Sequence, residues 1–348
     1  MSEATHLWVR HEVRDTERRT PVVPDDARRL VQAGLRVTVE ESPQRVFGTA
    51  SYQAAGCEIA PTGSWVDAPD AAVVVGLKEL PEGPPALRHR HVFFGHAYKG
   101  QRGAAELLDR FVAGGGALLD IEYLVDDNGR RLAAFGYWAG YVGAALAVLH
   151  RAGGLPLPLR PTSAEQLREA LHDASRVLDD HALVIGAWGQ AGTGARAALG
   201  DAGVAHTGWD RTETRPLNRS ALLAHDMLVN TVLSTDPTTE PFVTPDDLDA
   251  ADRRLAVICD VSCDVDSPFN VLPIYDRTTT WTEPARRLRT GPPPVDLIAI
   301  DNLPSLVPLE ASIRFSADLL PLLLTLGDDA PPWRRTRQRF EEAVAARV

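Results

Sequence analysis

ALVIGAWGQAGTGARAALGDAG, residues 182–203, is the stretch that decides the fold. An apolar run typical of a strand leads directly into a glycine-rich turn, and a helical pattern follows the turn, which is the context of a Rossmann nucleotide-binding motif. Glycines let the chain turn tightly and let a pyrophosphate approach the backbone, while the helix N-terminus offers amide donors. The spacing GxxGxxGxG departs from the common GxGxxG. The candidate cofactor-binding residues in the turn are Gly186, Gly189, Gln190, Ala191, Gly192, Thr193 and Gly194.

An acidic residue supplies the second half of this pattern. Asp210 in HTGWD follows the turn by about 20 residues, where a carboxylate at the end of the next strand accepts hydrogen bonds from ribose hydroxyls. A carboxylate there repels a 2′-phosphate, so NAD is favoured over NADP, although Arg211 beside it weakens that preference. The alternative is a purely structural turn followed by an unrelated aspartate.

Composition limits the classes of function. The chain has 348 residues, 44% of them hydrophobic, which predicts about two domains of ordinary size. The formal net charge of -11 argues against nucleic acid and anionic membranes as partners. The N-terminal stretch has no apolar segment typical of a signal peptide, and no run is long enough to span a bilayer. We therefore expect a cytoplasmic protein with small-molecule partners.

Strand and helix patterns alternate along the chain, which predicts an α/β fold with mostly parallel sheets covered on both faces. In the first part, strands are expected at 6–12, 36–42, 71–79, 91–97 and 117–125, with helices at 24–34 and 101–113. In the second part, further strands are expected at 226–232, 254–261 and 295–301, and longer helices at 133–150, 310–326 and 331–348.

The three cysteines do not indicate a metal site. Cys259 ends an apolar run and Cys263 follows it in VICDVSCDVDS, while Cys57 stands alone. A zinc site requires about four ligands, usually in recognisable pairs, and no such set is visible. We interpret Cys259 as a core thiol and Cys263 as a loop thiol, in preference to a redox or metal pair.

Ionisable residues follow several expected strands of the first part. In open α/β sheets ligands bind at the carboxyl ends of the strands. Taken singly, each such residue is more often a solvated surface group, but a basic cluster beside a histidine can bind carboxylates and move protons. The apolar run before Lys78 suggests partial burial of its amine. The candidates are Lys78, His96, Lys99, Glu122, Arg130, Arg131 and Arg19.

Motifs spread over nearly the whole chain carry a family resemblance. They are RTPVVP (19–24), VEESPQRVF (39–47), YQAAGCEI (52–59), PTGSW (61–65), GLKELPE (76–82), FGHAYKGQ (94–101), DIEYLVDDNGRRLAAFGYWAG (120–140), GAWGQAGTGA (186–195) and AIDNLPSLVPLEAS (299–312). In this order they resemble the NAD-dependent, lysine-forming saccharopine dehydrogenases of the fungal type, within the alanine dehydrogenase and transhydrogenase group.

The resemblance implies two Rossmann-like domains with an interdomain cleft. The substrate-binding domain would be discontinuous, residues 1–134 plus 308–348, and the NAD-binding domain would span 135–307. The fungal relatives suggest a monomer, and a small homo-oligomer stays open.

The resemblance also implies an enzyme that acts on a secondary amine. The reaction would be NAD-dependent oxidative cleavage of saccharopine to L-lysine and 2-oxoglutarate, or the reverse condensation, in lysine biosynthesis. By resemblance, Lys78 and His96 would be the acid–base pair and Glu122 would tune Lys78. The implied carboxylate-binding residues are Arg19, Arg130, Arg131 and Lys99, and Asp301 would complete the nicotinamide side.

The sequence departs from the family pattern at several places. Ala191 and Thr231 replace two cysteines, which rules out the corresponding disulfide, and the basic segment 285–296 matches poorly and suggests an altered entrance. An alternative is therefore a related opine-type dehydrogenase that joins a different amino acid or amine to a 2-keto acid. An alanine dehydrogenase-type deamination and a non-catalytic NAD-binding sensor are less favoured.

Overall fold

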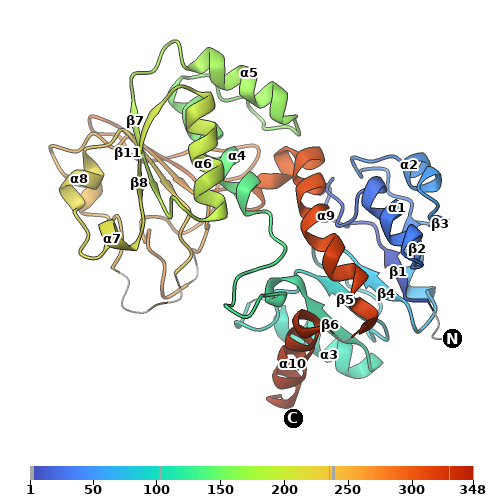
Figure 1. Ribbon diagram of the computed structural model, residues 1–348. Coiled ribbons are helices and arrows are strands. Elements are labelled where there is room, and N and C mark those ends of the chain that lie inside the picture. The colour runs from blue at the N-terminus through green and yellow to red at the C-terminus, as the bar shows by residue number, and fades with distance from the viewer. Residues whose placement is uncertain are drawn as a thin grey trace. The chain divides into compact units, whose positions relative to one another are not determined.

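The computed structural model describes residues 4–347 except residues 102, 235, 237–239, 266 and 329. The chain forms two compact units (Figure 1). Unit 1 contains residues 1–134 and 308–348, and unit 2 contains residues 135–307. None of the helices in the described ranges is long and apolar enough to cross a membrane.

Unit 1 is built on a six-stranded parallel sheet with the order β3-β2-β1-β4-β5-β6. The strands are β1 (His6–Val9), β2 (Arg36–Glu40), β3 (Glu58–Ala60), β4 (Val73–Val75), β5 (Arg90–Phe93) and β6 (Ala117–Asp120). Their side chains are largely buried, as expected for a parallel sheet covered on both faces. The carboxyl ends of all six strands therefore meet at one edge, which positions the polar residues that follow them.

Within the described part of unit 1, five α-helices accompany this sheet. They are α1 (Pro24–Gln32), α2 (Thr49–Ala54), α3 (Ala104–Gly114), α9 (Pro308–Leu324) and α10 (Pro331–Ala345). Helix α1 shows the local signals that predicted it: Pro24 occupies the first turn, Asp25 and Asp26 complement the helix dipole, and Gly34 follows the helix with φ of 92°.

The last two helices return to unit 1 after unit 2 has been completed (Figure 1). The hydroxyl of Ser312 on α9 accepts the amide of Thr20, and Ser316 accepts the amide of Val23, both at 3.0 Å. Trp333 at the start of α10 is fully buried. The chain before residue 134 thus lacks part of its hydrogen bonding and core until α9 and α10 are in place.

Unit 2 contains a second six-stranded sheet, ordered β11-β12-β10-β9-β7-β8, in which only β11 is antiparallel. Its strands are β7 (His181–Ile185), β8 (Ala205–Trp209), β9 (Met227–Asn230), β10 (Val257–Asp260), β11 (Arg286–Arg289) and β12 (Val295–Ile298). Its α-helices are α4 (Gly136–Arg151), α5 (Ala164–Ala174), α6 (Gln190–Asp201), α7 (Arg211–Thr214) and α8 (Arg219–Leu223).

Small residues let α4 and α6 approach each other closely. A Cβ atom built on Gly140 of α4 would lie 1.7 Å from the carbonyl oxygen of Ala191, and one on Gly194 of α6 would lie 1.9 Å from that of Tyr137. The contact requires glycine at both positions. It fixes the first turn of α6, which begins inside the glycine-rich loop.

Several elements differ from the sequence-based expectation. Helix α2, strand β3 and helix α5 were not predicted, and part of the basic segment 285–296 forms the edge strand β11. Most strands are shorter than their apolar runs; β4, for example, covers three residues of the expected 71–79. Cys259 is buried and Cys263 lies in a loop, both as free thiols, as predicted.

Candidate active-site residues in the two units

The glycine-rich loop of unit 2 joins β7 to α6 in a tightly packed turn. Gly186 has φ of 81°, a conformation that favours glycine. A Cβ on Gly192 would lie 2.1 Å from the carbonyl oxygen of Gly186. The next helix begins at Gln190, so its first amide groups follow the turn directly. This is the arrangement in which a backbone turn and a helix N-terminus bind a phosphate.

A cavity of about 360 Å³ lies beside this loop. Gly186, Gly189, Asp210 and Thr231 are among the residues that line it. The hydroxyl of Thr231, which stands in place of a family cysteine, donates to the carbonyl oxygen of Ile185 at 2.8 Å and so supports the turn. A glycine-rich turn, a helix N-terminus and a carboxylate at the next strand end fit the diphosphate and adenosine ribose of a dinucleotide.

The cofactor candidates with side chains differ in exposure. Asp210 follows β8, is half-buried, and caps α7 by accepting the amide of Arg211 at 2.9 Å. In α6, Gln190 and Thr193 are exposed and Ala191 is half-buried. Asp301 is an exposed residue shortly after β12.

One loop residue was not singled out from the sequence. The indole of Trp188 is 62% exposed, and the guanidinium carbon of Arg196 lies 4.2 Å from its ring centroid. Trp188 was visible as a large side chain among glycines. Its position places an aromatic surface at the dinucleotide turn.

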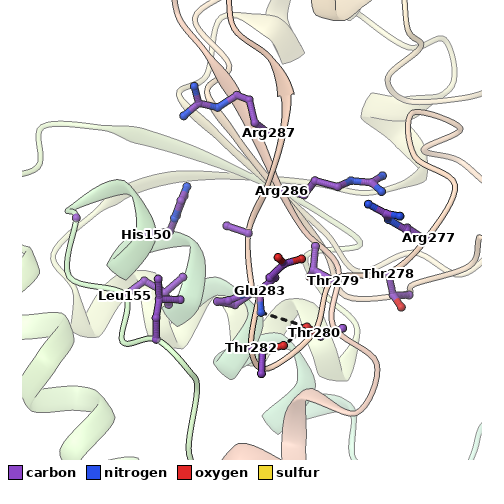
Figure 2. A pocket seen from close by; sticks show the side chains of 14 residues that line it. His150, Leu155, Arg277, Thr278, Thr279, Thr280, Thr282, Glu283, Arg286 and Arg287 are labelled. Atoms are coloured by element: carbon purple, nitrogen blue, oxygen red, sulfur yellow. Dashed lines mark hydrogen bonds between the residues drawn. The ribbon is translucent and has the colours of Figure 1, made fainter.

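A larger hollow of unit 2, about 860 Å³, lies away from the glycine-rich loop (Figure 2). Thr280 accepts the amide of Glu283 there at 3.1 Å. Two of its arginines are already paired: Arg286 binds Asp276, and Arg287 binds a carboxylate that His150 also contacts. The hollow contains residues 285–287 of the basic segment 285–296 but none of the candidate catalytic, substrate-binding or cofactor-binding residues, and its size alone does not make it the cofactor site.

In unit 1, Glu122 is the centre of a charged cluster at the carboxyl edge of the sheet. Its Oε1 atom accepts a hydrogen bond from Lys99 Nζ at 2.7 Å and from Arg131 Nη2 at 2.6 Å. His96 Nδ1 lies 3.9 Å from its other oxygen. Burial raises the pKa of Glu122, but the hydrogen bond from Lys99 and the charges of Arg131, Lys99 and His96 bring that pKa below its ordinary value. Glu122 is therefore a carboxylate that holds three basic groups together.

The backbone presents His96 to solvent. Its φ of 49° lies in the left-handed region, which is uncommon for a residue with a side chain. The imidazole is 55% exposed and stacks on Phe94, with ring centroids 6.5 Å apart. An accessible imidazole beside two cations can exchange protons with a bound anionic molecule.

A buried carboxylate below the cluster was missed by sequence reasoning. Asp120 ends β6 and is fully buried, and its Oδ1 atom accepts the amide of Glu122 at 2.9 Å. A Cβ atom on Gly95, next to His96, would lie 3.3 Å from Oδ2 of Asp120. Burial raises the pKa of Asp120 to about 7. The signal in the sequence was an acidic residue inside the apolar run LLDIE.

The other candidates of unit 1 differ in exposure. Lys78 is half-buried where the chain leaves β4. Arg19 is 2% exposed, and its guanidinium holds Glu17 through two hydrogen bonds of 2.8 and 2.6 Å. A substrate carboxylate at Arg19 would therefore share it with Glu17. Arg130 is exposed, and its charge lowers the pKa of Asp318, which burial raises.

The two units thus offer different chemistry. Unit 1 gathers lysine, arginine and histidine side chains at a sheet edge, which suits binding of carboxylates and proton transfer. Unit 2 offers a glycine-rich turn at a helix N-terminus, which suits binding of a diphosphate. Among the described residues no group of three or more histidine, cysteine or acidic side chains is placed to hold a metal ion.

Comparison with known proteins identifies the family. Residues 8–142 match the family model of the alanine dehydrogenase/PNT N-terminal domain. The chain is similar to saccharopine dehydrogenase [NAD(+), L-lysine-forming] of Neurospora crassa, with 42% identity over 98% of this chain and 97% of that protein. The corresponding Schizosaccharomyces pombe protein is 40% identical over 98% of this chain and 99% of its own length.

A solved structure shows the same fold. An L-alanine dehydrogenase superposes with a TM-score of 0.69 over 97% of this chain and 94% of its own, at 18% identity. That likeness supports the two-unit Rossmann-like architecture. The full-length similarity at 36–42% identity shows more: the chain belongs to the family of NAD(+)-dependent, L-lysine-forming saccharopine dehydrogenases.

Proposed function

We propose that the protein catalyses NAD-dependent oxidative cleavage of saccharopine to L-lysine and 2-oxoglutarate, and the reverse reductive condensation. In the cleavage direction saccharopine, NAD+ and water give lysine, 2-oxoglutarate, NADH and a proton. The full-length relatives are named as L-lysine-forming saccharopine dehydrogenases, and the chain covers 97–99% of their length.

The observation that carries the proposal is the cluster around Glu122. Saccharopine bears several carboxylates and a secondary amine, so its site requires cations and groups that move protons. Lys99 and Arg131 provide cations within hydrogen-bonding distance of one carboxylate, and His96 stands beside them. Because both cations are paired with Glu122 in the free protein, a substrate carboxylate can replace Glu122 at these cations or bind beside it.

Lys78 and His96 are proposed as the proton-transfer pair. A secondary amine must lose its proton before the adjacent C–H bond can give up hydride, and hydrolysis of the resulting substrate imine requires a base to activate water. The exposed imidazole of His96 suits exchange with water, and the half-buried Lys78 suits transfer from the amine. Arg19, Arg130 and Arg131 would orient the substrate carboxylates.

NAD, when bound, accepts or supplies the hydride. The turn from Gly186 to Gly194 would hold its diphosphate, and Asp210 would accept from its adenosine ribose. Asp301 is proposed on the nicotinamide side. We further propose a role in lysine biosynthesis in the cytoplasm, with the protein acting as a monomer or a small homo-oligomer.

The test is NADH oxidation, followed by absorbance, with 2-oxoglutarate and a panel of amines: lysine, ornithine, arginine and ammonia. We expect turnover that requires lysine and 2-oxoglutarate together, and saccharopine as the product by mass spectrometry. Turnover confined to another amine would overturn the substrate assignment. Absence of NADH binding would overturn the proposal as a whole.

Variants of Lys78 and His96 test their proposed roles in proton transfer. Lys78→Met and His96→Gln should each reduce kcat by about 10²–10⁴-fold, the range of general acid–base catalysis, with NADH affinity unchanged. His172→Gln, at an exposed position on α5, is the matched histidine control and should retain full activity. Wild-type turnover in Lys78→Met would refute the role of that lysine.

A further inference from the structure

The main chain at Lys78 is held by side chains where the sheet no longer holds it. Strand β4 ends at Val75, and the amide of Gly76 still donates to Val92 at 2.9 Å. Beyond this point Glu12 takes over: its Oε1 atom accepts the amide of Leu77 at 2.7 Å and its Oε2 atom accepts that of Lys78 at 2.9 Å. One carboxylate thus binds two consecutive amides.

The carbonyl side of the same residue is held by a cation. Nη2 of Arg10 donates to the carbonyl oxygen of Lys78 and, at 3.4 Å, to that of Glu79. Nη1 of Arg10 donates to the carbonyl oxygen of His11 at 2.8 Å and lies 3.5 Å from Glu12. Glu12 and Arg10 therefore grip Lys78 from both its amide and its carbonyl.

This pair is sealed from water. Arg10 is 1% exposed and Glu12 is 6% exposed. A Cβ atom on Gly76 would lie 2.4 Å from Nε of Arg10, so the guanidinium fits only because residue 76 is glycine. Burial raises the pKa of Glu12, and the charge of Arg10 and the two amide hydrogen bonds offset only part of that shift.

Such a pair is costly to bury and is weak evidence for stability, because an apolar pair of similar volume often stabilises a fold equally well. Apart from the hydrogen bond to His11, its side-chain contacts with main-chain groups are all made at the bend that carries Lys78. A proton-transfer group loses efficiency when its position drifts by even about 1 Å. A role in fixing that bend accounts for the burial of Arg10 and Glu12.

We propose that Glu12 and Arg10 are positioning residues that fix the backbone of Lys78 at the edge of the unit 1 sheet. This inference rests on the proposed function, in which Lys78 moves a proton. Neither side chain touches the substrate in this scheme. They act by setting where the lysine side chain begins and in which direction it leaves the sheet.

Glu12→Gln tests the proposal with a near-isosteric change. Glutamine keeps one acceptor oxygen, and its amide group would face a backbone N–H in place of the second. We expect kcat to fall at least tenfold, while the Kd for NADH and the KM for 2-oxoglutarate change less than threefold. The pKa assigned to Lys78 in the kcat/KM pH profile should also move.

Asp226→Asn is the matched control. Asp226 is 7% exposed, pairs with Arg254, and likewise accepts a backbone amide, that of His181 at 2.9 Å, all within unit 2. A general loss of stability would affect both variants, whereas loss of positioning should reduce kcat only in Glu12→Gln. Equal loss of kcat in both variants, or wild-type kcat and pH profile in folded Glu12→Gln, overturns the proposal.

A second variant covers the case in which Glu12→Gln does not fold. Arg10→Lys keeps the charge but cannot span the carbonyls of His11 and Lys78, and we expect the same selective loss of kcat. Lys78→Met distinguishes a failure of the proposed role of Lys78 from a failure of the positioning role of Glu12 and Arg10. If Lys78→Met stays active, the proposed role of the lysine fails; if it is inactive while the folded variants of Glu12 and Arg10 match wild type, only the positioning role fails.

Discussion

Replacing Asp120 by asparagine should change how the stability of unit 1 depends on pH. Asparagine keeps an oxygen that can accept the amide of Glu122, a bond of 2.9 Å in the structure, but it carries no charge. The pKa of Asp120 is raised by burial from 3.8 to about 7. Between these values the folded state binds a proton that the unfolded state has released, so the free energy of unfolding falls as pH rises.

The size of the effect follows from the shift. Each pKa unit corresponds to about 1.4 kcal/mol, so a shift of about three units gives about 4 kcal/mol over the whole range from pH 4 to pH 8. About 1.4 kcal/mol of this lies between pH 6 and pH 8, because a group with a pKa of about 7 binds on average half a proton over these two pH units. In Asp120→Asn this contribution is absent.

The assay must report on unit 1 alone. Hydrogen exchange of peptides covering β5 and β6, measured by mass spectrometry along a urea series, gives the local free energy of unfolding for wild type and Asp120→Asn. The difference between the two should grow in favour of the variant as pH rises from 6 to 8. A difference that is constant over this interval would refute the reasoning, because Asp120 would then be ionised or neutral throughout.

Three further predictions concern other positions. Gly140→Ala should lower the Tm of unit 2 strongly, since its Cβ would meet the carbonyl oxygen of Ala191 at 1.7 Å, whereas Gly200→Ala on α6, with open space, should stabilise by about 0.5–1 kcal/mol; calorimetry compares them. His91→Phe should reduce the loss of unfolding free energy that wild type shows on acidification below pH 6.5, because burial holds the pKa of His91 well below its ordinary value and its protonation therefore opposes folding. Urea unfolding of wild type and variant at pH 5 and pH 7 measures this, and an equal drop in unfolding free energy in both proteins would contradict it. Asp210→Ala should raise the Kd for NADH about tenfold and lower that for NADPH by fluorescence titration, because the variant also loses the repulsion of the 2′-phosphate, and an equal rise for both cofactors would count against ribose recognition.

The sequence predicted the elements whose signals are local. The proline, acidic pair and glycine around α1 specify that helix without reference to the rest of the chain. Strand β3 has only three residues, too few for a period to be visible, and pairs at the sheet edge through β2 alone. Helix α5 was missed although Ser163 and Gln166 form a capping box, a signal that was present and not used.

Part of the candidate site was also predictable from the sequence. Because the carboxyl ends of parallel strands share one edge, Lys99 and Glu122 could be expected near each other, and they form a hydrogen bond. Their supports differ in this respect. Asp120 caps the short helix that follows β6 by accepting the amide of Glu122, which is a local contact. Glu12 accepts the amides of Leu77 and Lys78, 65 and 66 residues away, and nothing local indicates these partners because they come from packing between strands.

The discontinuity of unit 1 has a consequence for synthesis on the ribosome. Unit 2 occupies one uninterrupted stretch, so all its strands have been made by residue 307. Unit 1 must wait for α9 and α10, whose serines and Trp333 complete its hydrogen bonds and core. The nascent chain therefore carries a nearly finished unit 2 together with the open, unfinished sheet of unit 1, which can fold fully only after α9 and α10 have been made.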